Sequence, residues 1–505
     1  MQNLLTNHRA LRVLRDARMP TNNWLLACYI CLLLVLGFTA ISDQMLHWFI
    51  VPVLFCGCIT GVDAIDWLRG KVDTFDIVGI LGLYGWYFFF LAPLLHIYWA
   101  CWTIDTDTTW PTDWRPWLGW MAALNALGLI VYRASYKAMA KPMQKSATKL
   151  WKLNLTSYWR FIFIAMLITV LVQIQVYKDS GGIQAYIANA TYLRMLGDRG
   201  QGMGWIFMIS ESFPVLAIFA YAVYARSHNR GRSWAIIIFV IIVFFGLRIL
   251  FGGLRGSRSN TVWALFWAMG VIHFWVRPVP RKLIFIGTCY LIVFMYFYGF
   301  FKGVGLDAVQ ALSSSESRVA LEESTGRNLK NTLLGDLGRS DIQSFLLYRI
   351  TSPTSDYTYA MGRTYLSAVS ILIPRSMMER QPGKEKEGTD AQYGMGSYIP
   401  IRQQSSKVYG LAGEAMLNFG PVGVPFAFLM WGFLVRYIRG FVASLDPSDP
   451  RLLIAPLLIN LGIIVLTSDL DNDIFDLIKN GFLPVLVLAM TTLLPYRNWS
   501  HARQG

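Results

Sequence analysis

The stretch Trp234-Ala-Ile-Ile-Ile-Phe-Val-Ile-Ile-Val-Phe-Phe-Gly-Leu-Arg-Ile-Leu250, followed by Gly253-Leu-Arg-Gly-Ser-Arg-Ser-Asn260, decides how this chain folds. The first part is almost entirely apolar, which is typical of a helix in the hydrocarbon core of a bilayer. Arg248 lies at its end, and Arg255 and Arg258 follow among glycines. Ionisable groups beside an apolar span are costly in lipid, so we interpret this stretch as part of a functional site.

Apolar runs of this kind recur along the whole chain of 505 residues. The composition is 55% hydrophobic and only 15% charged, whereas soluble proteins have about 25% charged residues. We therefore predict an all-α, polytopic transmembrane bundle. Its twelve expected spans are Trp24 to Ile41, Leu46 to Val62, Ile77 to Trp99, Trp117 to Tyr132, Tyr158 to Val176, Trp205 to Ala225, Trp234 to Leu250, Thr261 to Val276, Leu283 to Phe301, Leu411 to Val435, Leu452 to Thr467 and Leu477 to Pro495.

The distribution of basic residues predicts the orientation of these spans. Lys and Arg in short loops mark the cytoplasmic side of a membrane. One set of alternate connections is rich in them, and the short connections of the other set are acidic. Both termini are therefore expected in the cytoplasm, and the net charge of +15 reflects topology and attraction to anionic lipid rather than nucleic-acid binding. The basic set comprises Arg9, Arg12, Arg15, Arg18, Arg69, Lys71, Arg133, Lys137, Lys141, Lys145, Lys149, Lys152, Arg160, Arg226, Arg230, Arg232, Arg277, Arg281, Lys282, Arg436, Arg439, Arg451, Arg497 and Arg503.

The domain organisation follows from one long polar segment. Residues 1–302 hold the first nine spans, residues 303–410 form an outer loop, and residues 411–505 hold the last three spans. Loops longer than about 15 residues are usually functional or disordered.

Three parts of the outer loop have distinct patterns. Leu312 to Leu337 has the apolar spacing of an amphipathic helix. Tyr365 to Ile373 is semi-apolar and is expected to dip into the membrane surface. Gln381 to Gly388 has the turn chemistry of a mobile loop.

The first group of candidate site residues is basic. Glycines beside Arg255 and Arg258 let backbone amides approach an anion, and guanidinium groups bind phosphate oxygens in pairs. The alternative is that these side chains are solvated loop charges or membrane anchors. The expected substrate-binding residues of this kind are Arg248, Asn260, Arg363, Arg375, Arg402 and Lys407.

The second group surrounds Glu414. Glu414 and Asn418 are four residues apart, so they share one face of a helix. A partly desolvated carboxylate there could act as a general base on a hydroxyl. A structural ion pair with a nearby arginine is the alternative. Asn418, and Tyr409 just before this stretch, are expected to bind substrate.

Other candidates are weaker. The pattern Asp469-x-Asp-x-Asp473 resembles a cation-binding loop but lacks the glycine and the later glutamate of an EF-hand, so we interpret it as an acidic outer cap. Glu211, inside the sixth span, marks either a polar path or a helix contact. His96 is expected to be a satisfied interfacial residue. We predict no metal and no cofactor.

The chain resembles the Wzy-type O-antigen and capsule polymerases of bacterial inner membranes. The architecture carries most of this resemblance, and the motifs are Gly256-Ser-Arg258, Ile373-Pro-Arg375 and Gly410-Leu-Ala-Gly-Glu-Ala-Met-Leu-Asn-Phe-Gly420. Arg402 and Gly413 also have the spacing described for some members. The sequence departs from a scheme with two arginine-rich loops, because the loop after the fifth span has only Lys178, Arg194 and Arg199.

The resemblance implies a GT-C-like fold and a glycosyltransferase activity at the periplasmic face of the inner membrane. The substrates would be undecaprenyl-diphosphate-linked oligosaccharides, and a chain-length regulator would be a possible protein partner. Glu414 would be the base, and Arg255 and Arg258 would stabilise the diphosphate. Two alternatives remain open, which are an O-antigen ligase-like transferase and a non-enzymatic flippase of lipid-linked sugar.

Overall fold

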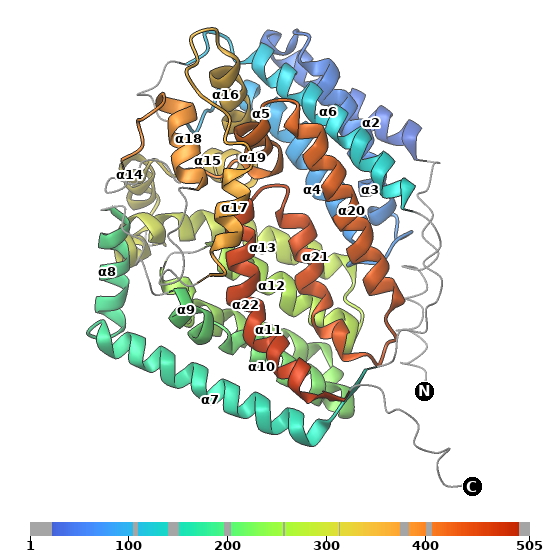
Figure 1. Cartoon of the computed structure of the whole chain (residues 1–505), viewed down its shortest axis with the longest axis vertical. Helices are drawn as coiled ribbons and strands as arrows, with labels where there is room; N and C mark the ends of the chain where they lie inside the picture. Colours follow the sequence, from blue (N-terminus) through green and yellow to red (C-terminus); the bar gives the residue numbers. More distant parts are fainter. Residues whose placement is uncertain are drawn as a thin grey trace.

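The computed structural model describes residues 23–104, 110–139, 151–195, 204–255, 258–312, 314–373, 383–399 and 407–493. These residues form a helical bundle, with a set of shorter helices, among them α14, α15, α16 and α18, gathered at one end (Figure 1). The only strands in the described part of the chain are β1 (Lys152–Leu153) and β2 (Thr492–Leu493), which pair antiparallel.

The first group of helices forms one side of the bundle. A 3-10 turn (Asp43–Met45) follows the first helix, and a π-helical turn (Tyr87–Leu91) joins the third and fourth. Within the group, α3 packs against α2, α4 and α6. The helices are α2 (Trp24–Ile41), α3 (Ile50–Leu68), α4 (Ile77–Trp86), α5 (Ala92–Trp99) and α6 (Arg115–Ala138).

The second group forms the other side. Short turns, Asn229–Arg232, Gly253–Arg255 and Ile272–Val276, connect or extend its members. The helices are α7 (Leu155–Asp179), α8 (Ile183–Met195), α9 (Gly204–Ser210), α10 (Phe213–Ser227), α11 (Trp234–Leu250), α12 (Arg258–Val271) and α13 (Arg281–Val304).

The predicted outer loop contains considerable helical structure. A 3-10 segment (Gly305–Leu312) and a π-helical turn (Thr332–Leu337) flank its first two helices, as the amphipathic pattern indicated. The expectation of a mobile loop over Gln381 to Gly388 is wrong at its C-terminal half, where a helix begins at Lys384. The helices are α14 (Ser315–Thr325), α15 (Leu329–Asn331), α16 (Ser340–Thr351), α17 (Arg363–Ser370) and α18 (Lys384–Tyr393).

The last group differs from the prediction at its first span. The apolar run Leu411 to Val435 is divided into two helices by a turn at Gly420, whose φ of 69° favours glycine. The first piece is a short helix and only the second is long enough to cross a membrane. The helices are α19 (Gly410–Phe419), α20 (Gly423–Ser444), α21 (Ala455–Ile464) and α22 (Leu470–Thr491), and a 3-10 turn (Pro450–Leu453) precedes α21.

Eight helices in the described ranges are long and apolar enough to cross a membrane, which is consistent with a helical membrane protein. They are α2, α3, the continuous segment Ile77–Trp99, α7, Gly204–Ser227, α13, α20 and α22. Three shorter apolar helices, Trp234–Leu250, Thr261–Val276 and Ala455–Ile464, coincide with the remaining predicted spans together with the 24-residue α6.

A buried ion pair joins α20 to the first group of helices at the end of α20 far from α19. Arg439 of α20 contacts Asp76 at 2.7 Å and donates to the hydroxyl of Tyr136 on α6. Asp76 also accepts hydrogen bonds from Val78 and Gly79 at the start of α4. One carboxylate therefore caps one helix and holds another in place.

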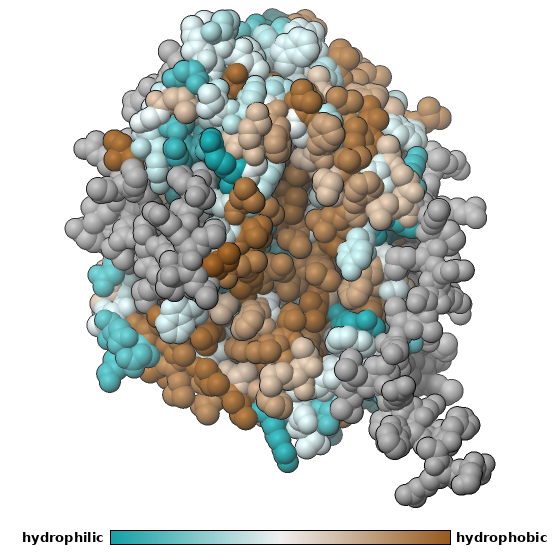
Figure 2. Space-filling view, in the orientation of Figure 1, coloured by the Kyte–Doolittle hydropathy of each residue, from teal (hydrophilic) through white to brown (hydrophobic). Residues whose placement is uncertain are grey.

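Apolar side chains cover the face of the molecule over α20, α21 and α22. Figure 2 shows a hollow with an apolar floor between α20 and α22, and hydrophilic side chains gathered over α16 and α18. Several large apolar side chains on the flanking helices are exposed. They are Phe426, Met430 and Tyr437 of α20, and Phe482, Leu486 and Met490 of α22.

Candidate active site

The start of α19 is held by a carboxylate from another helix. The Asp469 Oδ1 atom accepts hydrogen bonds from the backbone N–H groups of Tyr409 (2.9 Å) and Gly410 (2.8 Å). Gly410 has a φ of 69°, and a Cβ there would lie 2.6 Å from the carbonyl oxygen of Leu466. Only glycine fits this position, so the first turn of α19 is fixed against the segment before α22.

This turn carries Glu414 into a buried position. Glu414 is 4% exposed. Its Oε1 accepts a hydrogen bond from the hydroxyl of Thr364 (2.8 Å), and its Oε2 accepts one from the backbone N–H of Leu470 (2.8 Å). Burial, with Asp469 nearby, raises the pKa of Glu414 to about 8. The group is therefore poised to exchange a proton near neutral pH.

Asn418 lies beside Glu414, as the spacing of four residues predicted. Its side-chain amide donates to the Thr364 hydroxyl (2.6 Å) and to the carbonyl oxygen of Glu414 (2.8 Å). Its Oδ1 accepts from the backbone N–H of Gly362 (2.9 Å). Asn418 thus joins α17 to α19 and orients the hydroxyl that binds Glu414.

A buried lysine connects α18 to the same cluster. The ammonium of Lys384 lies 2.7 Å from Asp469 and 3.2 Å from Asp471. Burial alone would lower the pKa of Lys384, but the two carboxylates outweigh it and raise this pKa above its ordinary value. These contacts explain why a helix begins where turn residues predicted a mobile loop.

A second cluster forms where the sixth predicted span is interrupted. Between α9 and α10 lies the buried Glu211. It pairs with Arg255 and, at 3.2 Å, with Lys479 of α22. Arg248 donates to the Glu211 carbonyl (2.8 Å) and to the Asn480 side chain (2.6 Å).

The arginines of this second cluster therefore converge although no continuous helix links them. The helix α11 ends at Leu250, and Arg255 lies on the following 3-10 turn. The guanidinium carbon of Arg255 is 3.6 Å from the centre of the Phe207 ring. The two predicted arginines thus both contact Glu211, Arg248 at its backbone carbonyl and Arg255 at its carboxylate, and form a largely buried, cation-rich site.

The two clusters lie along α22. Glu414 contacts Leu470 at the first residue of this helix, and Glu211 contacts Lys479. Nine residues of α-helix correspond to about 13 Å. The two clusters therefore contact α22 at points about 13 Å apart along its axis.

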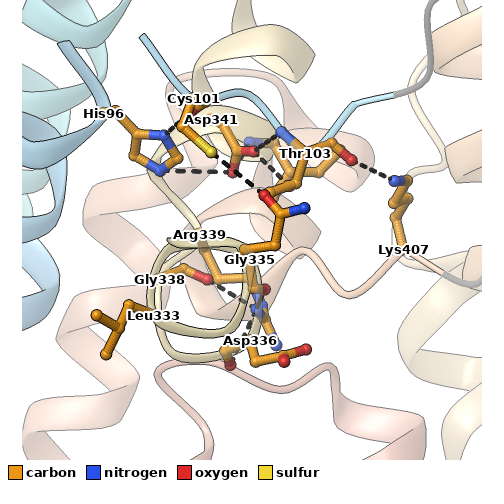
Figure 3. A network of polar contacts seen from close by, with 12 residues as sticks. His96, Cys101, Thr103, Leu333, Gly335, Asp336, Gly338, Arg339, Asp341 and Lys407 are labelled. Atoms are coloured by element: carbon orange, nitrogen blue, oxygen red, sulfur yellow. Dashed lines mark hydrogen bonds and ion pairs between the residues drawn. The ribbon is translucent and has the colours of Figure 1, made fainter. Parts of the chain in front are cut away.

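Two other predicted residues, Lys407 and Arg363, make their contacts outside these two clusters. Lys407 donates to the carbonyl oxygen of Thr103 (2.9 Å), and the backbone N–H of Thr103 donates to Asp341 (2.9 Å), as Figure 3 shows. Burial would raise the pKa of Asp341, but His96 and Thr103 outweigh it and lower this pKa. Lys407 is thereby linked to a buried polar network. Arg363, half-exposed, lies 3.1 Å from Glu387.

Four predicted residues cannot be placed as side chains. Arg375 and Arg402 lie outside the described residues. Arg258 begins α12 and Asn260 follows it in the same helix, but the structure describes only their backbone.

Several residues of the two clusters were not predicted to act together. The sequence predicts an acidic outer cap at Asp469 and Asp473, and both side chains are buried in the structure. The turn pattern predicts a loop at Lys384, and Lys479 is not among the predicted site residues. A charged residue inside an apolar run was the available signal for Lys479. Within the described ranges, no group of His, Cys, Asp and Glu side chains could hold a metal ion.

No known protein family matches the chain, and no curated protein and no solved structure is significantly similar to it.

Proposed function

We propose that the protein polymerises undecaprenyl-diphosphate-linked oligosaccharide repeat units at the periplasmic face of the bacterial inner membrane. The observation that carries this proposal is that a buried carboxyl, Glu414 of α19, and a cation-rich cluster both contact the helix α22. A carboxyl can accept the proton of an acceptor hydroxyl, and a cation-rich cluster can bind a lipid-linked diphosphate.

Glu414 acts on the acceptor in this proposal. It accepts the proton of a sugar hydroxyl while the hydroxyl oxygen bonds to the anomeric carbon of the donor. The bond from that carbon to the diphosphate breaks, and the electron pair leaves with the diphosphate. Thr364 and Asn418 hold the carboxyl in place, which supports this role because a catalytic base must be fixed within hydrogen-bond reach.

In this proposal the cluster of Arg248, Arg255 and Lys479 binds the diphosphate of the acceptor, not that of the donor. The leaving group must lie beside the attacking hydroxyl, and this cluster is about 13 Å from Glu414 along α22. We therefore assign it to the diphosphate of the acceptor, with the acceptor sugars extending toward Glu414. Arg363 at the start of α17 and Lys407 just before α19 are candidates for the donor diphosphate.

The apolar face over α20 and α22 supports entry of a lipid-linked substrate from the side. Its hollow (Figure 2) offers an apolar surface to a polyprenyl tail. Exposed large apolar side chains flank it on both helices. A substrate that is half lipid and half anion would thus contact both an apolar groove and charged clusters.

A transporter of lipid-linked sugar is the second candidate. The break between α9 and α10 places Glu211 inside a membrane-spanning segment, and interrupted helices of this kind bind substrates in transporters. A ligase-like transferase would use the same chemistry as the polymerase with another acceptor.

The phenotype of a deletion strain separates the three functions. Loss of a polymerase leaves single repeat units on the cell surface. Loss of a ligase leaves polymer on the lipid carrier, and loss of a transporter removes the surface glycan. Complementation with Glu414→Gln should restore insertion of the protein but not chain extension. A normal glycan ladder from this variant would contradict the proposal.

A further inference from the structure

Asp473 is a buried carboxyl for which the proposed reaction has so far no role. It lies in the second turn of α22 and is 2% exposed. Its Oδ1 atom has no hydrogen-bond partner in the described part of the chain. An unsatisfied buried carboxylate oxygen is costly, and ionisable groups at membrane depth commonly form proton relays.

The surroundings of Asp473 are mainly acidic. Asp469, Asp473 and Asp476 are spaced by four and three residues, so they lie on one face of α22. Ser468 hydrogen-bonds to Asp473, which also interacts electrostatically with Asp469, Glu414 and Asp476. Three further titratable groups border this acidic face, which are Tyr365 of α17 and Lys384 of α18, both near Asp469, and Lys479 of α22, 3.8 Å from Asp476.

The acidic face connects a buried group with a partly exposed one. Glu414 is buried and both of its oxygens accept hydrogen bonds from the protein. The side chain of Asp476 is 23% exposed. A proton taken up by Glu414 must leave before the next turnover, and Asp473 interacts electrostatically with both Glu414 and Asp476.

We propose that Asp473 relays protons between Glu414 and Asp476. This inference rests on the proposed polymerase function. In each turnover the proton of the acceptor hydroxyl passes to Glu414, then to Asp473, then to Asp476 and finally to water. One proton leaves for each glycosidic bond formed, and the electron pair of the broken bond stays on the departing diphosphate, so the reaction balances.

The test compares variants of the purified full-length protein acting on a lipid-diphosphate-linked oligosaccharide. Asp473→Asn should lower turnover about tenfold or more, while binding of the lipid-linked substrate stays unchanged. Added formate, a small carboxylate that can replace the missing group, should restore part of the turnover. Asp473→Glu should retain more activity than Asp473→Asn, and the loss should be greatest at low pH, where release of a proton is hardest.

The controls separate this proposal from a structural role and from the function itself. Asp179→Asn at the end of α7, where the carboxylate accepts a hydrogen bond from Gln175, should leave turnover unchanged. If Asp473→Asn fails to fold, Asp476→Asn tests the relay in its place. Its turnover should also be lowered, and formate should restore part of it. Normal turnover in the folded variant would overturn the relay, and so would a loss that formate does not rescue. Failure of the wild-type protein to extend the glycan would instead overturn the polymerase function.

Discussion

At the scale of single residues, Glu414 is mostly protonated at neutral pH, because burial beside Asp469 raises its pKa to about 8. A general base must be ionised to act. Turnover should therefore rise with pH up to about 8 and level off above it. Glu414→Gln should lower turnover about a hundredfold or more and remove this dependence. Initial rates of chain extension measured across this pH range would check both expectations, and an unchanged profile in the variant would contradict them.

The same carboxyl makes stability depend on pH. The pKa of Glu414 is higher in the folded than in the unfolded protein, so the unfolded state binds fewer protons between the two values. The contribution of Glu414 to the free energy of unfolding is therefore full at low pH and is lost as the pH rises toward about 8. Thermal unfolding in detergent should show this slope, and Glu414→Gln should weaken it. An equal slope in both proteins would assign it to other groups.

Arg255 supports a prediction about substrate binding. Arg255→Ala should raise the KM for the lipid-linked acceptor more than it lowers kcat, because its cluster lies about 13 Å along α22 from Glu414. Lys479→Met tests the same cluster from α22. Saturation curves with the purified protein distinguish the two parameters. A fall in kcat alone would place Arg255 at the reacting atoms instead.

At the scale of elements, the ion pairs of Lys384 attach α18 to the start of α22. Lys384→Met would leave Asp469 and Asp471 without this buried cation, and breaking a buried pair typically costs about 3–5 kcal/mol. The double variant Lys384→Met/Asp469→Asn should recover part of that loss, because it also removes a buried charge. Denaturation midpoints of the single and double variants measure this coupling, and additive losses would contradict it.

The elements also show what local sequence could predict. Apolar runs identified each membrane-length helix because hydropathy depends on the helix itself. The break at Gly420 lies inside one apolar run, where a turn over residues 420–422, with a positive φ at Gly420, separates α19 from α20. Glu414 and Asn418 were predicted as neighbours from their spacing. The partners of Glu414, Thr364 and Leu470, lie 50 and 56 positions away in sequence, so no local pattern could indicate them.

At the scale of the whole molecule, the buried pair of Arg439 and Asp76 ties α20 to the first group of helices, and α19 packs at the other end of α20. The basic loops predict that both termini are cytoplasmic. Single cysteines at exposed sites in α14 and in the loop before α21 should therefore react with a membrane-impermeant thiol reagent from opposite sides. Equal labelling of both in intact cells would contradict this topology and move Glu414 away from the periplasm.

The most direct test of the account is extension of a lipid-linked glycan by the pure protein in a bilayer. Incubated with undecaprenyl-diphosphate-linked oligosaccharide, the wild-type protein should give a ladder of products differing by one repeat unit, and Glu414→Gln should give the unextended substrate. A wild-type protein that leaves the substrate unextended, or a variant that produces the same ladder, would contradict the assignment of Glu414 and its helix α19 as the catalytic centre.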